Sequence, residues 1–174
     1  LNIRIFILII YNKNKNIYIY NKGKCIYTNK EYDKDSLDFE SNITSYKMDY
    51  IIYNKNPYSL EELNQYIFNK YKIKVNIFDK IYHLLKYVCH PIRNYISKSD
   101  NIMNSTTYQL FGIDILLDNN LNPYILEINK GPDMNIRCKQ DEILKKNLYK
   151  NVYSKLNIIK YKNNNFIKLI SLNN

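Results

Sequence analysis

Several residue types are scarce in this sequence of 174 residues, which contains three glycines, three cysteines, and neither alanine nor tryptophan. Three glycines exclude a glycine-rich phosphate-binding loop, because such a loop needs several glycines close together. Cys25, Cys89 and Cys138 lie far apart and form no CxxC pair. This spacing excludes a disulfide framework and a cysteine-based zinc site, and it indicates a reducing compartment.

Long apolar runs and blocks of like charge are also missing. The run from Ile5 to Tyr11 is too short to cross a bilayer, and no small-residue cleavage site follows it, so we expect a buried strand there. The net charge of +10 suits an acidic partner. The lysines are scattered, however, and a solvated basic surface explains the charge equally well.

Asparagine, lysine, isoleucine and tyrosine are abundant instead. The 19 tyrosines and the other three residue types are spread evenly, which indicates codon bias of the genome rather than function. A length of 174 residues is enough for one domain with a buried core. Hydrophobic residues make up 45% and charged residues 24%, which is typical of a folded domain.

The first part of the chain is rich in β-forming residues. Arg4 to Tyr11 and Asn16 to Tyr20 are separated by a short polar segment, which predicts a hairpin, and a third short strand is expected near Lys24 to Thr28. Residues 29–57 show no sustained periodicity, so we expect a long loop.

Three helices are predicted. Ser59 is followed by Glu62 at the spacing of a capping box, which predicts a helix start. Apolar residues recur at helical spacing from Ile77 to Val88, and Pro91 is expected to end or kink that helix. Helical periodicity returns from about Lys139 to Leu156.

The remaining segments read as strands, from Tyr108 to Leu117, from Pro123 to Ile128 and from Phe166 to Ile170. The order of strands, helices, a hairpin and a last helix predicts an α+β fold, in which helices flank a mainly antiparallel sheet.

Two carboxylates interrupt the apolar hairpin between residues 108 and 129. Burying a lone carboxylate costs several kcal/mol or forces it to take up a proton, so Asp114 and Glu127 require an explanation. Side chains alternate along a strand, so Glu127 and Asn129 share a face. A turn centred between Asn120 and Leu121 brings Asp114 to the same face. The predicted cross-strand pairs are Asp114–Glu127, Gly112–Asn129 and Leu116–Ile125.

Two carboxylates directly opposite each other repel, and a divalent cation between them removes that penalty. Mg²⁺ takes oxygen ligands and completes its shell with phosphates and water. The sequence therefore predicts a nucleotide-linked magnesium site at Asp114, Glu127 and Asn129. The alternative is a surface hairpin whose acidic residues face water. The other face of the hairpin is expected to fill the core, through Ile113, Ile115, Leu126 and Ile128.

The same segment carries a resemblance to a known family. Tyr-Gln-Leu-Phe-Gly-Ile-Asp-Ile-Leu-Leu-Asp at residues 108–118, followed by Pro-Tyr-Ile-Leu-Glu-Ile-Asn at residues 123–129, resembles the metal-binding signature of tubulin–tyrosine ligases and their polyglutamylase and glycylase relatives. In that family the aspartate, glutamate and asparagine hold magnesium on ATP. The resemblance implies this role for Asp114, Glu127 and Asn129.

The N-terminal residues extend the resemblance. Residues 1–9 are similar to the family's Lys-Phe-Asp-Ile-Arg strand, residues 17–23 to its Ile-Tyr-Leu-Tyr-x-x-Gly hairpin, and residues 42–46 to its His-Leu-Thr-Asn-Tyr loop. This implies that Arg4 is catalytic and binds the transferring phosphate, since a guanidinium fork suits phosphate oxygens. The alternative for Arg4 is a head group in solvent. The nucleotide contacts that the resemblance implies are Asn2, Arg4, Thr44 and Ser45.

Three positions depart from the family pattern. Asn2 stands where the family has aspartate, Ile26 where it has arginine, and Ser45 where it has asparagine. These departures favour a second interpretation, a pseudoenzyme or nucleotide-binding module of the same fold that has lost ligation. A third interpretation, a nucleic-acid-binding protein, follows only from the charge and the tyrosines, and no nucleic-acid-binding module is recognisable.

The resemblance implies an ATP-grasp-like C-terminal subdomain. Residues 1–174 would be the C-terminal portion of the domain, with the N-terminal nucleotide subdomain absent, so this piece alone is expected to be inactive. The whole protein is expected to use ATP and Mg²⁺ to add tyrosine, glutamate or glycine to a protein carboxylate through an acyl phosphate. Basic residues such as Lys130, Arg137 and Lys139 would attract the acidic tail.

The expected partners are a free amino acid and an acidic protein tail, of tubulin or a similar protein. We expect no nucleic acid and no membrane as partner, a monomer, and a cytoplasmic or microtubule-associated location.

Overall fold

The computed structural model describes residues 1–13, 15–96 and 105–172. The strands are β1 (Asn2–Tyr11), β2 (Asn16–Tyr20), β3 (Lys24–Ile26), β4 (Thr107–Leu117), β5 (Pro123–Lys130) and β6 (Phe166–Ser171). The helices are α1 (Phe39–Asn42), a 3-10 helix (Tyr50–Asn54), α2 (Leu60–Tyr71), α3 (Ile77–Ile96) and α4 (Lys139–Lys155).

All the strand pairings between these elements are antiparallel, and the strand order is β5-β4-β1-β2-β6. β1 lies in the middle, with β4 along one edge and with β3 and then β2 along the other. The predicted hairpin of β1 and β2 is present, as is the hairpin of β4 and β5. The predicted α+β fold with an antiparallel sheet is therefore confirmed.

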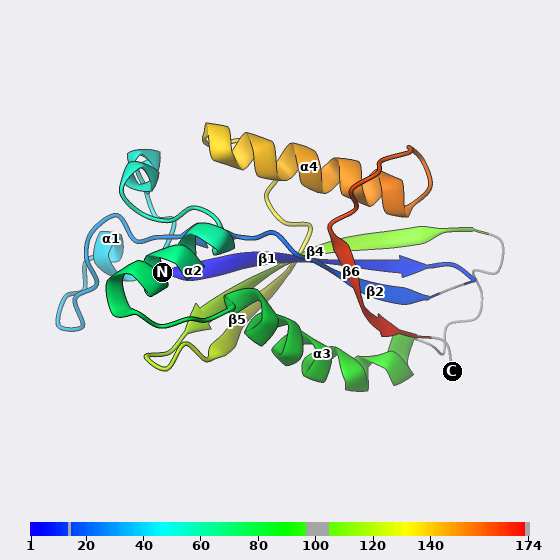
Figure 1. The fold of residues 1–174 in the computed structure, drawn as a ribbon, viewed down its shortest axis with the longest axis horizontal. Helices are drawn as coiled ribbons and strands as arrows, with labels where there is room; N and C mark the ends of the chain where they lie inside the picture. Colours follow the sequence, from blue (N-terminus) through cyan, green and yellow to red (C-terminus); the bar gives the residue numbers. More distant parts are fainter. Residues whose placement is uncertain (14, 97–104, 173–174) are drawn as a thin grey trace.

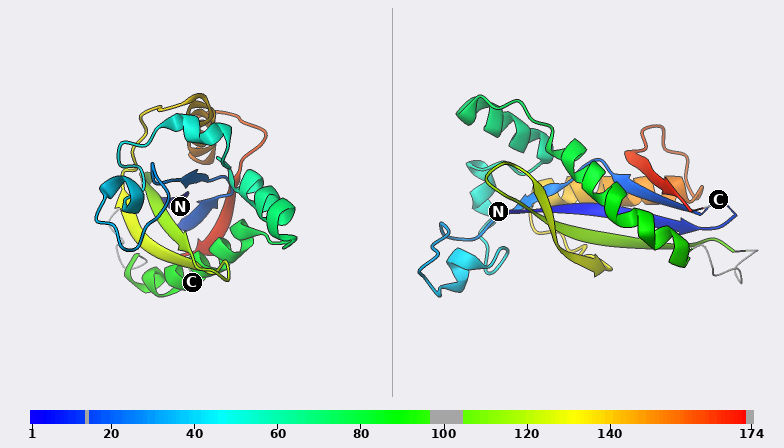
Figure 2. Two further views of the ribbon diagram at one scale, coloured as in Figure 1. Left: turned by 90° about the vertical axis from the view of Figure 1, so that its left-hand side faces the viewer. Right: turned by 90° about the horizontal axis from the view of Figure 1, so that it is seen from below.

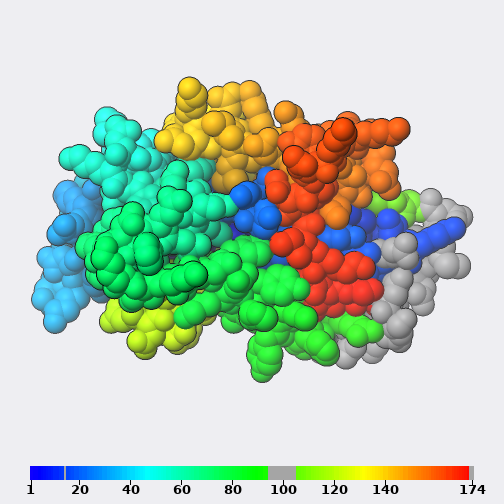
Figure 3. Space-filling model, in the orientation of Figure 1, coloured from blue at the N-terminus to red at the C-terminus, as the bar shows by residue number. Residues whose placement is uncertain are grey.

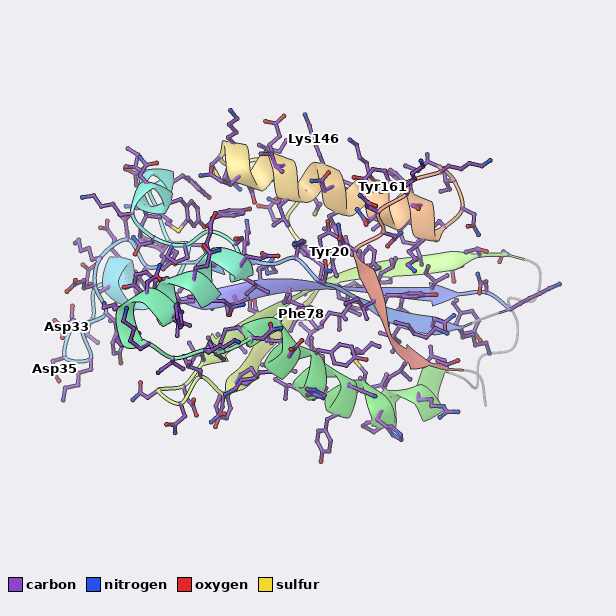
Figure 4. All side chains as sticks on the ribbon, in the orientation of Figure 1. Tyr20, Asp33, Asp35, Phe78, Lys146 and Tyr161 are labelled. Atoms are coloured by element: carbon purple, nitrogen blue, oxygen red, sulfur yellow. The ribbon has the colours of Figure 1, made fainter. Side chains whose placement is uncertain are left out.

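Helices cover both faces of the sheet (Figure 1). Viewed from the end, α4 lies on one side of the sheet and α3 on the other (Figure 2). Tyr20 lies on the α4 side, where it is almost fully buried, whereas Lys146 points away from the sheet on the outer side of α4 (Figure 4). The strands therefore separate two apolar layers.

The central strand β1 contributes to both layers, because successive side chains of a strand point to opposite faces. Ile3, Ile5 and Ile7 belong to the core under α2 and α3, while Phe6 and Leu8 belong to the core under α4. This explains why β1 reads as a continuous apolar run. It also places Asn2 and Arg4 on the α4 side, at the end of the strand where that apolar layer stops.

The predicted helix boundaries agree with the structure except at the end of α3. Ser59 and Glu62 form both bonds of the predicted capping box before α2. Of the two predicted effects of Pro91, ending or kinking the next helix, the first is wrong, because α3 continues through Pro91 to Ile96. Proline lacks only one helical hydrogen bond, and packing of α3 on the sheet compensates for that loss. In the part of the chain that is described, no helix is long and apolar enough to cross a membrane.

Residues 29–57 are mostly irregular, as predicted, but they contain α1 and the 3-10 helix. Asp38 caps α1, and Asp49 caps the 3-10 helix, each with its side-chain oxygen accepting a bond from a backbone N–H two residues on. Such short helices leave no detectable periodicity, which is why the sequence indicated only a loop.

The β4–β5 hairpin contains a bulge that the sequence did not reveal. Asp114 faces Glu127 and Gly112 faces Asn129, as predicted. The predicted pair of Leu116 with Ile125 is wrong: the register shifts after Asp114, so that Leu116 faces Tyr124. A bulge inserts one extra residue into one strand and bends it.

The apolar face of this hairpin is only partly buried. Ile113 and Ile115 of β4 are in the core, as predicted, but Leu126 and Ile128 of β5 are 54% and 50% exposed. The prediction of core positions is therefore wrong for β5. The reason is topological, since β5 is an edge strand with a neighbour on one side only.

Candidate functional site

A pocket of about 350 Å³ lies at the N-terminal end of β1, and we call it the candidate pocket. Three neighbouring strands, β1, β4 and β5, and the loop before the 3-10 helix contribute to it. Its polar lining residues include six of the seven residues predicted for the site from the sequence. These six are Asn2, Arg4, Thr44, Ser45, Asp114 and Glu127.

The side chain of Arg4 forms a bidentate ion pair with Asp114. Arg4 Nε donates to Asp114 Oδ1, and the terminal guanidinium nitrogen donates to Oδ2 at 2.9 Å. The two residues are directly opposite each other in the β1–β4 pairing, which places both side chains on the same face. Arg4 therefore points into the pocket rather than to open solvent.

Two further carboxylates lie near this ion pair. Burial alone would lower the pKa of Arg4, but the bonds to Asp114 and the charges of Asp114, Glu127 and Asp133 outweigh it and raise the pKa above its ordinary value. Asn129, the seventh predicted residue, donates a bond from Nδ2 to Glu127 Oε1 at 2.7 Å. One arginine and three carboxylates, Arg4, Asp114, Glu127 and Asp133, form what we call the pocket cluster.

The loop with Thr44 and Ser45 is held against the sheet by its backbone. Ser45 N–H donates to the carbonyl of Tyr27 at 2.9 Å. Ser45 has a φ of 66°, in the left-handed region that costs free energy for most residues and that Asn and Gly tolerate better. Ser45 therefore lines the pocket in a strained backbone conformation.

The pocket also has an unsatisfied polar atom and an apolar wall. Asn2 is 5% exposed, and its Oδ1 accepts no hydrogen bond from the described residues. Buried acceptors of this kind cost free energy unless a ligand or water supplies a donor. Ile26, Ile43 and Leu126 line the pocket as well, so part of its wall is apolar.

The donor set fits a hard divalent cation. Asp114 and Glu127 supply carboxylate oxygens from adjacent strands, and the Asn129 amide oxygen lies on the same strand face as Glu127. No group of three or more histidine, cysteine or acidic residues that suits a metal ion occurs among residues 1–13, 15–96 and 105–172. A cation here would therefore need additional oxygen ligands, as Mg²⁺ does when it takes phosphates and water.

Glycines allow the backbone to approach the ion pair closely. A Cβ atom on Gly112 would lie 2.8 Å from Cβ of Pro132 and 3.1 Å from Cδ of Arg4, so a side chain at this position would displace one of them. Gly131 has a φ of 79°, which reverses the chain after β5 and carries Pro132 back over the hairpin.

A second group of charges, next to the candidate pocket, was missed by sequence reasoning. Asp141 at the start of α4 is 1% exposed and accepts bonds from Lys24 Nζ and Lys145 Nζ, both at 2.7 Å. It also accepts from the Tyr58 hydroxyl at 3.2 Å and from the Arg137 backbone N–H at 3.2 Å. We call Lys24, Asp141 and Lys145 the α4 cluster.

A signal for the α4 cluster was present in the sequence. Asp141 and Lys145 are spaced like Leu144, Leu148 and Val152, so two charged residues interrupt the buried stripe of an amphipathic helix. The sequence carried no comparable signal for Asp133. This residue lies in a loop, and only the folding of the chain brings its charge near Arg4.

Comparisons with known proteins agree with the hairpin signature. The sequence model of the Tubulin-tyrosine ligase family matches residues 1–165. The probable alpha-tubulin polyglutamylase Ttll1 of Tetrahymena thermophila is 26% identical over 162 residues, which covers 87% of this chain and 38% of that protein. The probable tubulin polyglutamylase TTLL2 of Mus musculus is 26% identical over 163 residues, covering 87% and 29%. Tubulin glycylase 3F of Tetrahymena thermophila is 28% identical over 171 residues, covering 91% and 18%. The chain thus spans well under half the length of these relatives.

Proposed function

This chain belongs to the tubulin-tyrosine ligase family, and on that premise we propose that the protein is an ATP-dependent ligase that joins an amino acid to a protein carboxylate. The observation that supports the proposal most is the meeting of Arg4, Asp114 and Glu127, from three adjacent strands, around one pocket. An ATP-grasp arrangement with Mg²⁺ is part of the same proposal.

In the proposed site, Asp114, Glu127 and Asn129 would hold Mg²⁺, and the metal would supply positive charge for the phosphates of ATP. Arg4 exchanges one of its bonds to Asp114 for a phosphate oxygen, which its fork-shaped guanidinium binds well. Asn2 Oδ1 accepts a hydrogen bond from a donor on the bound nucleotide, which satisfies its buried oxygen. Thr44 and Ser45 line the pocket from the loop before the 3-10 helix.

The proposed reaction has two steps. The acceptor carboxylate attacks the terminal phosphorus of ATP, which forms an acyl phosphate and releases ADP. The amino group of the incoming amino acid then attacks the acyl carbon, phosphate leaves, and an amide bond remains. Because both steps move negative charge onto phosphate oxygens, the contribution of the protein is positioning and electrostatic stabilisation.

The proposed acceptor is an acidic tail, and tubulin is the first candidate, because the matched relatives are named as tubulin polyglutamylases and a tubulin glycylase. Lys130 and Lys139 are exposed on either side of the loop after β5. Arg137, also exposed, donates to Asp133 at 3.2 Å, so part of its charge is already compensated.

The test is Glu127→Gln in the complete protein, which keeps the size of the side chain and removes one charge from the proposed metal site. We expect incorporation of a labelled amino acid into tubulin to fall by orders of magnitude. The melting temperature is expected to stay within a few degrees, since Glu127 is exposed.

Glu142→Gln is the matched control, because Glu142 is an acid on the outer side of α4 that pairs with Lys146. It is expected to leave incorporation unchanged. Full specific activity of the Glu127→Gln protein would contradict the proposal.

A second candidate is a nucleotide-binding protein of the same family without ligase activity. It is favoured by the position of Asn2, Ile26 and Ser45, which depart from the family pattern and all line the candidate pocket. The complete, unmodified protein separates the two: ATP binding without incorporation of any of tyrosine, glutamate and glycine supports the second candidate.

A further inference from the structure

A second pocket, of about 460 Å³, lies at the opposite end of the sheet, and we call it the far pocket. It lies where the apolar layer between α4 and the sheet ends. Asn2 and Ile10, which line the two pockets, are eight residues apart on β1, a distance of about 26 Å at ~3.3 Å per residue. The far pocket is therefore a separate site. Its polar lining residues are Asn12, Asn16, Lys155, Asn157, Lys168 and Ser171.

One aromatic ring brings two lysines together in this pocket. Tyr18 of β2 faces Lys168 of β6 in the strand register, so both side chains lie on the same face of the sheet. Lys155, the last residue of α4, places its ammonium nitrogen 4.6 Å from the centre of the Tyr18 ring. β6 lies on the surface between the end of α4 and α3 (Figure 3).

The positive charge of this pair is not compensated. Neither Lys155 nor Lys168 forms an ion pair with a residue of the described part of the chain, and no acidic residue lines the far pocket. Burial, and then the charge of Lys168, lowers the pKa of Lys155. The half-buried Lys24 and the buried Lys145 differ from this pair, because both of them bind Asp141.

We propose that the far pocket binds an anionic oxygen-rich group, a phosphate or a carboxylate. The two ammonium groups supply the charge, while the Asn157 amide and the Ser171 hydroxyl are donors that can complete the coordination of an oxyanion. This inference does not depend on the proposed ligase activity, since it concerns different residues at the other end of the sheet.

The experiment measures binding of inorganic phosphate and, separately, of a short glutamate-rich peptide to the protein, by calorimetry and by NMR of Tyr18 and Ser171. Lys155→Gln and Lys168→Gln are each expected to weaken binding about 5- to 10-fold, as expected when one charged contact is lost. Lys150→Gln is the matched control, because it removes the same charge from an exposed position of α4 outside the pocket.

The results separate the two sources of the anion. Phosphate binding without peptide binding identifies a phosphate-bearing ligand, and the reverse identifies an acidic peptide. The proposal is overturned if neither probe binds at millimolar concentration, if Lys150→Gln weakens binding as much as the pocket variants, or if the resonances of Tyr18 and Ser171 do not respond.

Discussion

The pocket cluster and the α4 cluster lie next to each other on one face of the sheet, yet they are built in opposite ways. In the pocket cluster one cation, Arg4, faces three carboxylates at the edge of a pocket. In the α4 cluster one carboxylate, Asp141, is enclosed by two lysines, a tyrosine hydroxyl and a backbone N–H. Arg4 and Lys24 face each other across the paired strands β1 and β3, so the two clusters are adjacent.

This difference indicates that the pocket cluster can bind a ligand, whereas the α4 cluster stabilises the fold. Every acceptor position of Asp141 is used, and Lys145 additionally donates to the Asn135 carbonyl, which fixes the loop that follows β5. Asp141 therefore has no acceptor position left for a ligand. The pocket cluster has excess negative charge and adjoins the unsatisfied oxygen of Asn2, so it can accept a further cation or donor.

The largest expected effect is on the α4 cluster. Asp141→Asn leaves the buried Lys145 and the half-buried Lys24 facing a neutral amide, and breaking a buried ion pair in this way costs about 3–5 kcal/mol of unfolding free energy. Chemical denaturation, followed by circular dichroism, measures this loss.

Asp114→Asn is the contrasting change in the pocket cluster, with an expected cost of only about 1–2 kcal/mol. The cost is smaller because Arg4 keeps the neighbouring charges of Glu127 and Asp133 and reaches the open pocket. Equal losses of unfolding free energy for Asp141→Asn and Asp114→Asn would contradict the distinction between the two clusters.

The pH dependence of stability sharpens the same comparison. Burial alone would raise the pKa of Asp141, but the bonds from Lys145 and Lys24 outweigh it, so the pKa in the folded protein lies below the ordinary value of 3.8. A carboxyl whose pKa falls on folding adds stability above its unfolded pKa, and this stability is lost as the pH falls through the folded pKa.

The difference in melting temperature between the unmodified protein and Asp141→Asn is therefore expected to be largest near neutral pH and to decrease below about pH 4. Thermal unfolding from neutral to strongly acidic pH measures it. A difference that stays constant over this range would show that Asp141 acts through packing rather than through its charge.

The smallest expected effect concerns strain at the candidate pocket. Ser45→Gly removes a side chain from a residue with a φ of 66°, and relief of the left-handed conformation is expected to stabilise the fold by about 0.5–1 kcal/mol. Thr44→Gly is the matched control: Thr44 is not among the described residues with positive φ, so glycine there is expected to destabilise. A loss of stability for both variants would show that the loop is not strained at Ser45.

Much of the fold was predictable because it depends on local periodicity. The apolar run of β1, the capping box at Ser59 and the helical spacing of α4 are properties of short segments, and all three predictions are confirmed. The facing pair of Asp114 and Glu127 was also predictable, since a hairpin turn fixes the register of its two strands. Their proposed role in binding magnesium stays a prediction.

The errors occur where distant segments decide the outcome. The exposure of Leu126 and Ile128 depends on β5 being an edge strand, and that depends on the strand order of the whole sheet. The bulge after Asp114 changes the pairing of one hairpin without any glycine or proline at that position. Pro91 is tolerated because α3 packs on the sheet.

The sequence by itself determined the strands and the three long helices, though not α1 or the 3-10 helix, and it determined that acidic residues interrupt the β4–β5 hairpin. Only the tertiary structure decided that Arg4, 110 residues before Asp114, is its partner, and that Lys24 and Lys145 converge on Asp141. The physical reason is that periodicity acts over a few residues, through backbone geometry. The partner of a charged side chain is fixed only when the register between distant strands and the packing of a helix on the sheet bring the two groups together.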